Sequence, residues 1–257
     1  MYPILFQYKL ISIGGYGVML GLGFYLAFLL FERELKIRDM DPELAYKILL
    51  VAIPAGIVGS KIFHILEHWD DFVQYPMEMI FSGAGLSAYG GFILAFIISY
   101  FVIKRSKASL LTVCDAVTPS LALGYCFGRF GCHVAGDGCY GIAVKPYHIL
   151  QFLGTSYPNG IVPVSAPVFP TPLFEVFVSV AVLGAMLQLR RLEWPAGKLF
   201  FLYMILNGLP RFLVEIIRTN PVMFLGMTQA QVIGLFLTIT GILGIVLLER
   251  NKAAAQS

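Results

Sequence analysis

Charged residues are scarce in this sequence. Only 13% of its 257 residues are Asp, Glu, Lys or Arg, whereas 58% are hydrophobic, and the mean hydropathy is +0.80. Soluble domains carry about 25% charged residues, so the composition excludes an ordinary soluble domain and indicates an integral membrane protein. The net charge of +3 is small and gives no reason to expect a nucleic-acid partner.

Several sequence signals are also missing. The first residues, MYPILFQYKL, lack the basic start and the small-residue cleavage site of a secretory signal peptide, so we expect none. There is no low-complexity segment, heptad run or convincing internal repeat, which favours one helical domain over residues 1–257. The missing inverted repeat disfavours a secondary transporter, and no filter motif suggests a channel.

Seven apolar runs approach or exceed the roughly 20 residues that a transmembrane helix needs. They cover residues 12–32, 45–66, 84–103, 112–128, 172–189, 198–217 and 229–248. We therefore expect an all-α integral membrane protein with about seven transmembrane helices.

Basic residues alternate between the connections of these runs. Lys and Arg gather within 33–38, 104–107, 190–198 and 250–252, and they are few in the connections between those segments. Because cytoplasmic loops carry the excess of Lys and Arg, we expect the N-terminus outside and the C-terminus in the cytoplasm. The long connection 129–171, rich in Gly and Pro, is then predicted to form a small external cap rather than a regular helix.

Ionisable residues in or beside these runs need a reason, because each costs about 2.5–3.5 kcal/mol on insertion scales. They are Lys61, Asp115, Arg129, Glu175, Arg211, Glu215 and Arg218. One interpretation is that they form structural ion pairs, as the four-residue offset of Arg211 and Glu215 suggests. The other is that Arg129 and Arg211 bind a phosphate, because a guanidinium can contact two phosphate oxygens at once. A phosphate site at the outer leaflet would suit a phospholipid head group.

The segment GRFGCHVAGDGCYG (128–141) combines glycines with ionisable residues. His133 lies between Arg129 and Asp137, so it is either a general base or a surface histidine. Cys132 and Cys139 lie on the predicted external side, where a disulfide is allowed. Their spacing is not diagnostic of a metal or redox motif.

Two other patterns are ambiguous from sequence. Tyr16 in GGYGVML, and Tyr89, Gly90 and Gly91 in SAYGGF, suit either close helix packing or close approach of a ligand. His64 and His68 have the four-residue spacing of a helical metal-ligand pair, but HILEH lacks the glutamate position of the zincin pattern. We expect no metal and no cofactor.

Taken in order, the sequence resembles the prolipoprotein diacylglyceryl transferases of bacterial membranes. The resemblance runs through SIGGYGVMLGLGFYLAF, VGSKIFHI, GLSAYGGF, the segment from GRFG to YG, PTPLFEVF, NGLPRFLVEIIR and MTQAQVIG. It implies seven transmembrane helices in the bacterial inner membrane. It also implies transfer of the diacylglyceryl group of phosphatidylglycerol to the lipobox cysteine thiol of a prolipoprotein at the outer face, with release of glycerol phosphate.

The resemblance also assigns residues. Arg129 and Arg211 match the two essential arginines, and Asp137 stands where the family has glutamate. Further matches are Tyr16, Gly90, Gly91, Glu175, Glu215 and Arg218, whereas Lys61 replaces an arginine. The family's His-Gly-Gly motif is here Tyr89-Gly90-Gly91, and two signature asparagines are replaced by Cys132 and Ala135.

These assignments imply a division of roles. Arg129 and Arg211 would stabilise the phosphate leaving group, and the base acting on the thiol would be His133, Tyr89 or Asp137, with His133 preferred. The substrate-binding set would be Tyr16, Lys61, Gly90, Gly91, Glu215 and Arg218. The altered motif leaves two alternatives: a paralogue using the same phospholipid cavity with another lipid or acceptor, and a phospholipid-binding protein without activity.

Overall fold

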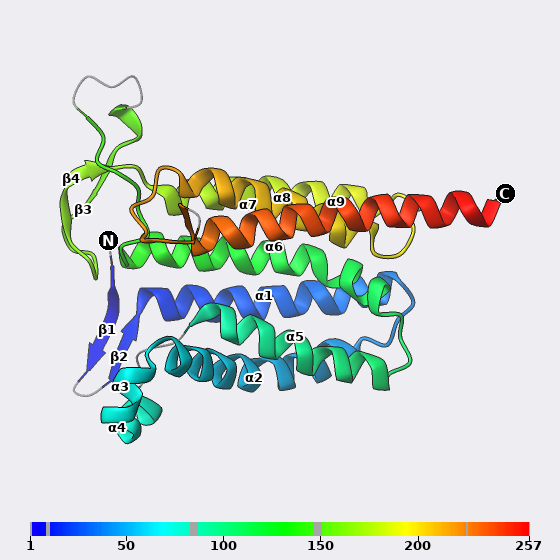
Figure 1. Ribbon diagram of the computed structural model, residues 1–257, viewed down its shortest axis with the longest axis horizontal. Coiled ribbons are helices and arrows are strands. Elements are labelled where there is room, and N and C mark those ends of the chain that lie inside the picture. Colours follow the sequence, from blue (N-terminus) through cyan, green and yellow to red (C-terminus); the bar gives the residue numbers. More distant parts are fainter. Residues whose placement is uncertain (1, 9–10, 83–86, 146–150, 225, 257) are drawn as a thin grey trace. The chain divides into compact units, whose positions relative to one another are not determined.

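The computed structural model describes residues 2–8, 11–82, 87–145, 151–224 and 226–256. Most of these residues are helical, with short strand pairs between the helices (Figure 1). The chain divides into two compact units. The larger unit comprises Met1–Leu30 and Cys114–Ser257, and the smaller unit comprises Phe31–Val113.

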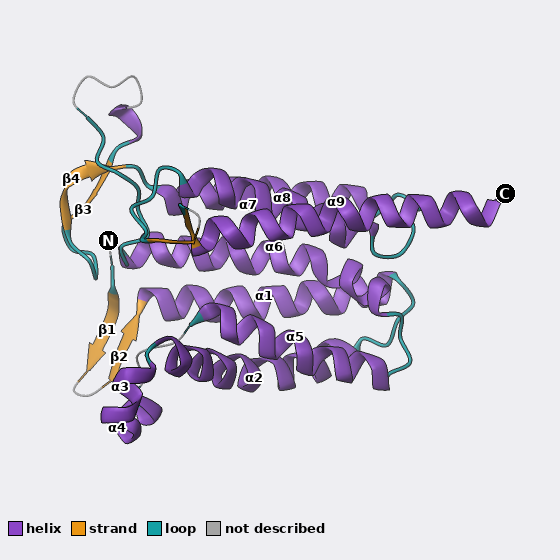
Figure 2. Ribbon diagram, in the orientation of Figure 1, coloured by secondary structure: helices purple, strands orange, loops and turns teal. Residues whose placement is uncertain are grey.

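The larger unit combines long helices with three antiparallel strand pairs, β1–β2, β3–β4 and β5–β6. Its elements are β1 (Ile4–Tyr8), β2 (Ile11–Gly14), most of α1 (Gly15–Ile37) and of α6 (Leu110–Ala135), η1 (Gln151–Leu153), β3 (Thr155–Tyr157), β4 (Val164–Val168), α7 (Thr171–Leu189), α8 (Lys198–Glu215), β5 (Val222–Phe224), β6 (Met227–Thr228) and α9 (Gln229–Gln256). The strand pairs all lie at the same end of this unit's helices (Figure 2).

The smaller unit is a helix pair with two short helices between its members. It contains α2 (Glu43–Glu67), α3 (Trp69–Gln74), α4 (Pro76–Phe81) and α5 (Ala88–Arg105), together with the end of α1 and the start of α6. Glycines let α2 and α5 approach closely: a Cβ on Gly90 would lie 2.4 Å from the Gly59 carbonyl oxygen, and one on Gly91 would lie 2.8 Å from that of Gly56. Small residues at a helix interface commonly permit such packing in membranes.

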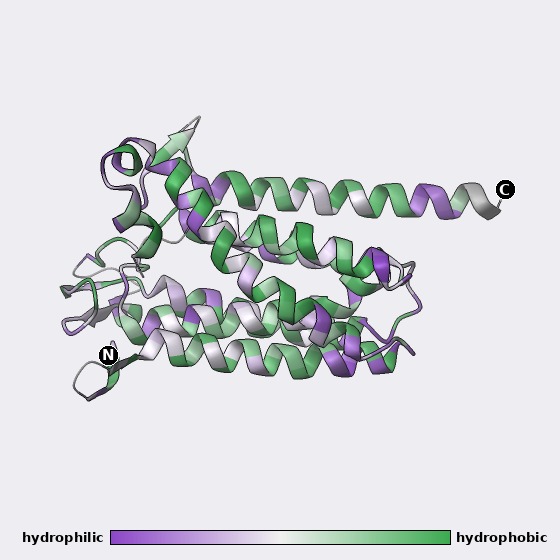
Figure 3. Cartoon of the chain, turned by 90° about the horizontal axis from the view of Figure 1, so that it is seen from below, coloured by the Kyte–Doolittle hydropathy of each residue, from purple (hydrophilic) through white to green (hydrophobic). Residues whose placement is uncertain are grey.

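The predicted helical membrane protein is confirmed in its coarse form. Among the described residues, five helices, α1, α2, α6, α7 and α9, are long and apolar enough to cross a membrane. Helices α5 and α8 overlap the other two predicted runs, of which residues 84–86 lie outside the described residues. Along α9, hydrophobic residues give way to hydrophilic ones toward its C-terminal end (Figure 3). The count of seven spans and the orientation of the termini stay predictions, and the short strand pairs were not predicted.

The predicted boundary at residue 128 was wrong. Helix α6 continues to Ala135, so Arg129 and His133 are helical and the segment predicted to form an external cap is non-helical only from Gly136. Of the helical glycines that suggested a loop, Gly131 packs closely, because a Cβ there would lie 3.1 Å from the Tyr16 ring, whereas one on Gly128 would meet nothing within 4 Å.

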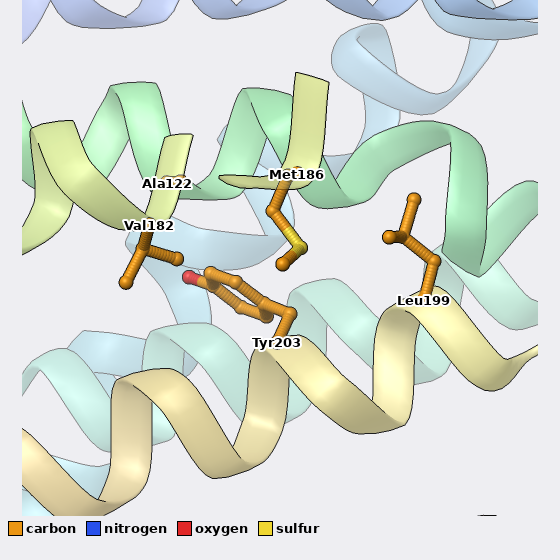
Figure 4. Close-up of a cluster of buried hydrophobic side chains, with 5 residues drawn as sticks. All are labelled: Ala122, Val182, Met186, Leu199 and Tyr203. Carbon is orange, nitrogen blue, oxygen red and sulfur yellow. The ribbon is translucent and has the colours of Figure 1, made fainter. Parts of the chain in front are cut away.

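A buried cluster packs α6, α7 and α8 together. It consists of Ala122 from α6, Val182 and Met186 from α7, and Leu199 and Tyr203 from α8 (Figure 4). Met186 is fully buried, and its flexible thioether suits an irregular gap between three helices. The cluster fixes the helices on which the polar site is built.

Asp115 fixes the start of α8. Its carboxylate oxygens accept the backbone N–H groups of Gly197 at 2.7 Å and Phe200 at 2.8 Å, which satisfies donors left open at a helix N-terminus. Gly197 has φ +93°, a conformation that glycine adopts without strain. Because Arg211 lies eleven residues beyond Phe200, this anchor sets its position about 16 Å farther along the helix.

Candidate functional site

Two buried glutamates and three largely buried arginines, of which Arg129 and Arg211 are 16% and 15% exposed, meet at the end of the larger unit that carries the strands. Arg129 comes from the last turns of α6, Glu175 from the start of α7, Arg211 and Glu215 from the end of α8, and Arg218 from just beyond α8. We call these five residues the arginine–glutamate cluster. The glutamate side chains are 3% and 0% exposed, and Arg218 is 5% exposed.

Glu175 is the centre of the cluster. Its Oε2 lies 3.3 Å from Nε of Arg129 and 3.6 Å from Nη1 of Arg218, and its Oε1 lies 3.4 Å from Nη1 of Arg211. The Tyr125 hydroxyl donates to Oε1 at 2.6 Å. One carboxylate therefore connects three arginines that are distant in the sequence.

Glu215 holds two of the same arginines from the other side. Its Oε2 lies 2.7 Å from Nη1 of Arg211 and 3.7 Å from Nε of Arg218. Its Oε1 accepts the Asn220 amide at 2.5 Å and the Thr228 hydroxyl at 3.0 Å. The Thr228 contact brings the segment before α9 into the site.

The cluster carries more positive than negative charge. Three arginines against two glutamates leave one net positive charge, since 3 − 2 = 1. Nη1 of Arg211 and both Nε and Nη1 of Arg218 lie at ion-pair distance from the glutamate oxygens. Neither these donors nor Oε2 of Glu175 and of Glu215 reach hydrogen-bond geometry within the described part of the chain. Buried charge without full compensation costs free energy, so an anion that met these donors would stabilise the cluster.

A narrow pocket leads from the apolar core to the cluster. Its polar end is formed by Tyr125, Glu175 and Arg211, and its apolar end by Val182 and Tyr203. Its volume of about 10 Å³ is close to the minimum for one water molecule. This pocket is therefore too small for a lipid chain.

Main-chain hydrogen bonds connect the cluster to the loop after α6. We call residues 136–142 the signature loop. The Gly141 N–H donates to the Phe169 carbonyl at 2.8 Å, the Ile142 N–H donates to the Ile217 carbonyl at 2.8 Å, and Gly141 pairs with Arg218 in an antiparallel bridge. The loop is thereby held between the start of α7 and the end of α8.

The signature loop also brings two thiols and a carboxylate together. Gly136 and Gly138, with φ +61° and +88°, turn the chain so that Cys139 returns over the last turn of α6. Possible ligand atoms of Cys132, Asp137 and Cys139 all lie within 4.8 Å of one another. Both cysteines are free thiols, so the disulfide that the sequence allowed is not formed here. A hydrogen bond with Cys132 lowers the pKa of the Cys139 thiol to about 7, although burial opposes this.

His133 contacts the aromatic residues of the cap. Its Nδ1 lies 2.9 Å from the Tyr157 hydroxyl, and the two rings meet edge to face with centroids 5.5 Å apart. Tyr157 in turn stacks on Tyr140 at 4.6 Å. Burial raises the pKa of the Tyr157 phenol, so this hydroxyl keeps its proton at neutral pH.

The other predicted site residues divide between the two units. Tyr16, at the start of α1, interacts electrostatically with Cys132, Asp137 and Arg129 and so belongs with the signature loop. Lys61, Tyr89, Gly90 and Gly91 lie in the smaller unit. There the Lys61 ammonium donates to the Ser82 carbonyl at 2.9 Å, and the glycines form the close contact between α2 and α5.

Sequence reasoning missed three contributors to the cluster: Tyr125, Asn220 and Thr228. Tyr125 precedes Arg129 by one helical turn, and the Arg129 guanidinium lies 5.1 Å from its ring centroid. That spacing was a usable signal. Thr228 falls within MTQAQVIG, a segment quoted for the family resemblance without a role.

The fold and the site together define the class of protein to which this chain belongs. This is a helical membrane protein with a buried, partly unsatisfied cluster of arginines at one end of its helices, and such a cluster is suited to an anionic group. The model of the family "Prolipoprotein diacylglyceryl transferase" matches residues 3–247. The chain belongs to this family.

Three relatives named phosphatidylglycerol–prolipoprotein diacylglyceryl transferase illustrate the similarity. The protein of Leptospira interrogans is 32% identical over 236 residues, covering 81% of this chain and 72% of the relative. That of Clostridium tetani is 31% identical over 244 residues, covering 94% and 96%. That of Dehalococcoides mccartyi is 31% identical over 242 residues, covering 91% and 89%.

Proposed function

We propose that this protein transfers the diacylglyceryl group of phosphatidylglycerol to the cysteine thiol of a prolipoprotein lipobox. Family membership across nearly the whole chain supports this reaction. The arginine–glutamate cluster is the observation that locates the reaction in the structure, through its net positive charge and its buried donors without hydrogen bonds.

The cluster would bind the phosphate of the lipid, and it would bind the departing phosphate more strongly. A phosphodiester carries one negative charge, which matches the single excess positive charge of the cluster. As the ester bond breaks, a second negative charge develops on the departing phosphate. Fixed donors stabilise this developing charge more than the ground state, which is the requirement for catalysis.

The reaction then follows in one displacement. The thiol loses its proton, and its sulfur attacks the glycerol carbon that bears the phosphate. The carbon–oxygen bond breaks, a thioether forms, and glycerol phosphate leaves with the bonding electrons. Arg129 and Arg211 are the proposed phosphate ligands, and the position and burial of Arg218 add it to them. Glu175 and Glu215 position the guanidinium groups.

We also propose the general base and the remaining substrate-binding residues. His133 would act as base with Nδ1–H donating to Tyr157, because Nε2 is then free to accept the thiol proton. Asp137 and Tyr89 are the alternatives, although a phenol titrating near ~10 is a weak base at neutral pH. Substrate-binding roles are proposed for Tyr16, Lys61, Gly90, Gly91, Glu215 and Arg218.

We also propose which membrane holds the protein and which side of that membrane the cluster faces. A prolipoprotein presents its lipobox after export, so the cluster would face the outer side of the bacterial inner membrane. The distribution of Lys and Arg supports this orientation, because it predicts an external connection after α6.

The test is a reconstituted transfer assay. The full chain in lipid nanodiscs receives phosphatidylglycerol labelled in its terminal glycerol and a synthetic lipobox peptide. We expect thioether-linked peptide and labelled glycerol phosphate in equal amounts, with both lost in Arg211→Ala and kept in Lys252→Ala, an exposed control. Lipid binding without either product would reject the proposed reaction.

A further inference from the structure

We propose that Cys132, Asp137 and Cys139 bind a zinc ion that activates the acceptor thiol. This inference rests on the proposed function, because it concerns the thiol of that reaction. The sequence spacing of these residues did not indicate a metal. The structure adds that their ligand atoms all lie within 4.8 Å of one another.

The geometry is close to what zinc requires. With a Zn–S bond of about 2.3 Å, two ligands of a tetrahedral site lie about 3.8 Å apart. The three groups here would therefore need to move by only about 1 Å. Thiolate sulfur is a soft ligand that favours Zn²⁺ over the hard cations Mg²⁺ and Ca²⁺.

The surrounding backbone is built to hold these ligands. Cys132 is fixed on the last turn of α6 and is 8% exposed. Asp137 lies between two glycines with positive φ, and its Oδ1 accepts the Cys139 N–H at 3.1 Å, which leaves Oδ2 for a metal. The Thr171 hydroxyl donates to the Cys139 carbonyl at 2.5 Å, which fixes the third ligand from the other side.

The charge balance also favours a cation. Two thiolates and a carboxylate carry three negative charges, and a divalent ion leaves one. Arg129 and Arg218 both interact electrostatically with Cys139, so a divalent ion limits the negative charge that would compete with a phosphate for these arginines. The phosphate ligands therefore adjoin the proposed metal.

Three protein ligands leave a fourth position open, as in catalytic zinc sites. A lipobox thiol binding there would lose its proton to water, because a thiol that coordinates zinc is deprotonated, and the metal would then replace His133 as the group that activates the thiol. The metal-bound sulfur would then attack the glycerol carbon, and glycerol phosphate would leave toward the arginines. The neutral thioether product is a weaker ligand and dissociates. This arrangement would supply the activation that is attributed to histidine where the family has His-Gly-Gly and this chain has Tyr89.

Metal binding is tested with Co²⁺ as a spectroscopic probe of the full chain in nanodiscs. We expect a thiolate-to-cobalt charge-transfer band that is lost in the Cys132→Ser, Cys139→Ser double variant. The control is His64→Gln, His68→Gln, because His64, Glu67 and His68 form the other possible metal-ligand group among the described residues. This control should keep the band, and stabilisation by phosphatidylglycerol shows whether the serine variant is folded.

Activity provides the second arm. Chelation should lower glycerol phosphate release by at least about 10²-fold, the lower end of what a general base contributes, and Zn²⁺ should restore it. Asp137→Ala should lose Zn²⁺ affinity, whereas Asp137→Cys, which supplies another thiolate, should keep it. A structural role of the carboxylate would not produce that rescue.

Two kinds of failure are distinguishable. Full transfer after chelation, no charge-transfer band, or a Cys132–Cys139 disulfide in the active protein would each overturn the zinc site while the proposed function stands. Absence of glycerol phosphate release from the zinc-loaded protein would instead reject the proposed function, and with it the role of the metal in activating the thiol.

Discussion

The two units each contain a buried arginine–glutamate arrangement, and the two differ in balance. In the smaller unit, Arg38 pairs with Glu34 one helical turn away, with Nη1 and Oε2 2.6 Å apart, and also donates to the Glu34 carbonyl at 3.1 Å. In the larger unit, three arginines share two glutamates at mostly longer distances. A pair of one arginine and one glutamate has no net charge, whereas the arginine–glutamate cluster carries one net positive charge that a ligand can meet.

This difference separates a structural ion pair from a binding site without any reference to sequence motifs. Residues one turn apart on a helix can form a pair from local geometry alone. The cluster instead requires α6, α7 and α8 to meet. Burying its excess positive charge costs free energy, which an anionic ligand would offset. The comparison predicts that changes in the cluster affect transfer and that changes in the Arg38–Glu34 pair affect stability.

The largest effect is expected from Arg211→Ala. It removes the guanidinium that contacts both Glu175 and Glu215, and transfer should fall by about 10³-fold, the upper end for losing one transition-state donor. The measurement is kcat/KM for glycerol phosphate release, with thermal unfolding as a check of folding. Loss of less than tenfold would remove Arg211 from the phosphate site.

Glu175→Gln should have the next largest effect. The change keeps the size of the side chain but removes the charge that positions three arginines, and we expect kcat to fall by about 10²-fold. KM for phosphatidylglycerol should not rise, because the cluster becomes more positive. Glu175→Asp should restore part of kcat. An equal loss of kcat in the Asp variant would argue that the exact carboxylate position, not its charge, matters.

A smaller effect is expected from Asn220→Ala. Glu215 would lose one of its two neutral donors and keep Thr228, and a hydrogen bond to a charged group is worth about 1.5–3 kcal/mol. Because Asn220 acts on the arginines only through Glu215, kcat should fall by less than in Glu175→Gln. Thr228→Val provides the matched change at the other donor. If either variant were as inactive as Arg211→Ala, that residue would have to contact substrate.

Arg38→Ala should leave transfer by the folded protein unchanged. It removes the ion pair that the buried Glu34 carboxylate makes with Arg38, and breaking a buried pair typically costs about 3–5 kcal/mol. The free energy of unfolding should fall accordingly, which denaturant titration in detergent can measure. The double variant Arg38→Met, Glu34→Leu should recover much of that loss. A large fall in kcat for folded Arg38→Ala would contradict the comparison.

The fold was predictable where the length of an apolar run determines the secondary structure. Each predicted run corresponds to a helix, because about 20 apolar residues in a membrane must satisfy their backbone groups internally. The end of α6 was not predictable in this way. Glycine content suggested a loop after residue 128, whereas in the structure Gly131 lies within α6 and packs against Tyr16.

The candidate site was predictable in its residues and not in its connections. The four-residue offset of Arg211 and Glu215 indicated their pair, which the structure contains. The central position of Glu175 depends on three helices meeting and has no local signature. The same holds for Cys132 and Cys139, whose proximity depends on the positive φ of Gly136 and Gly138. Whether Lys61, Tyr89, Gly90 and Gly91 act with the cluster stays a prediction.

The hydrogen bonds that hold the signature loop run from main chain to main chain, through Gly141, Phe169, Ile142 and Ile217. Such bonds do not involve the side chains of Phe169, Ile142 and Ile217, but Gly141 leaves no room for one, because a Cβ there would lie 2.6 Å from the Ile217 carbonyl oxygen. Substitutions at the other three positions can therefore accumulate over evolutionary time without moving Arg218 or Cys139. A single inserted residue is different, because it would shift the pairing by about 3.3 Å and reverse the side chains beyond it. We therefore expect residue types in these paired segments to vary among relatives while the number of residues stays constant.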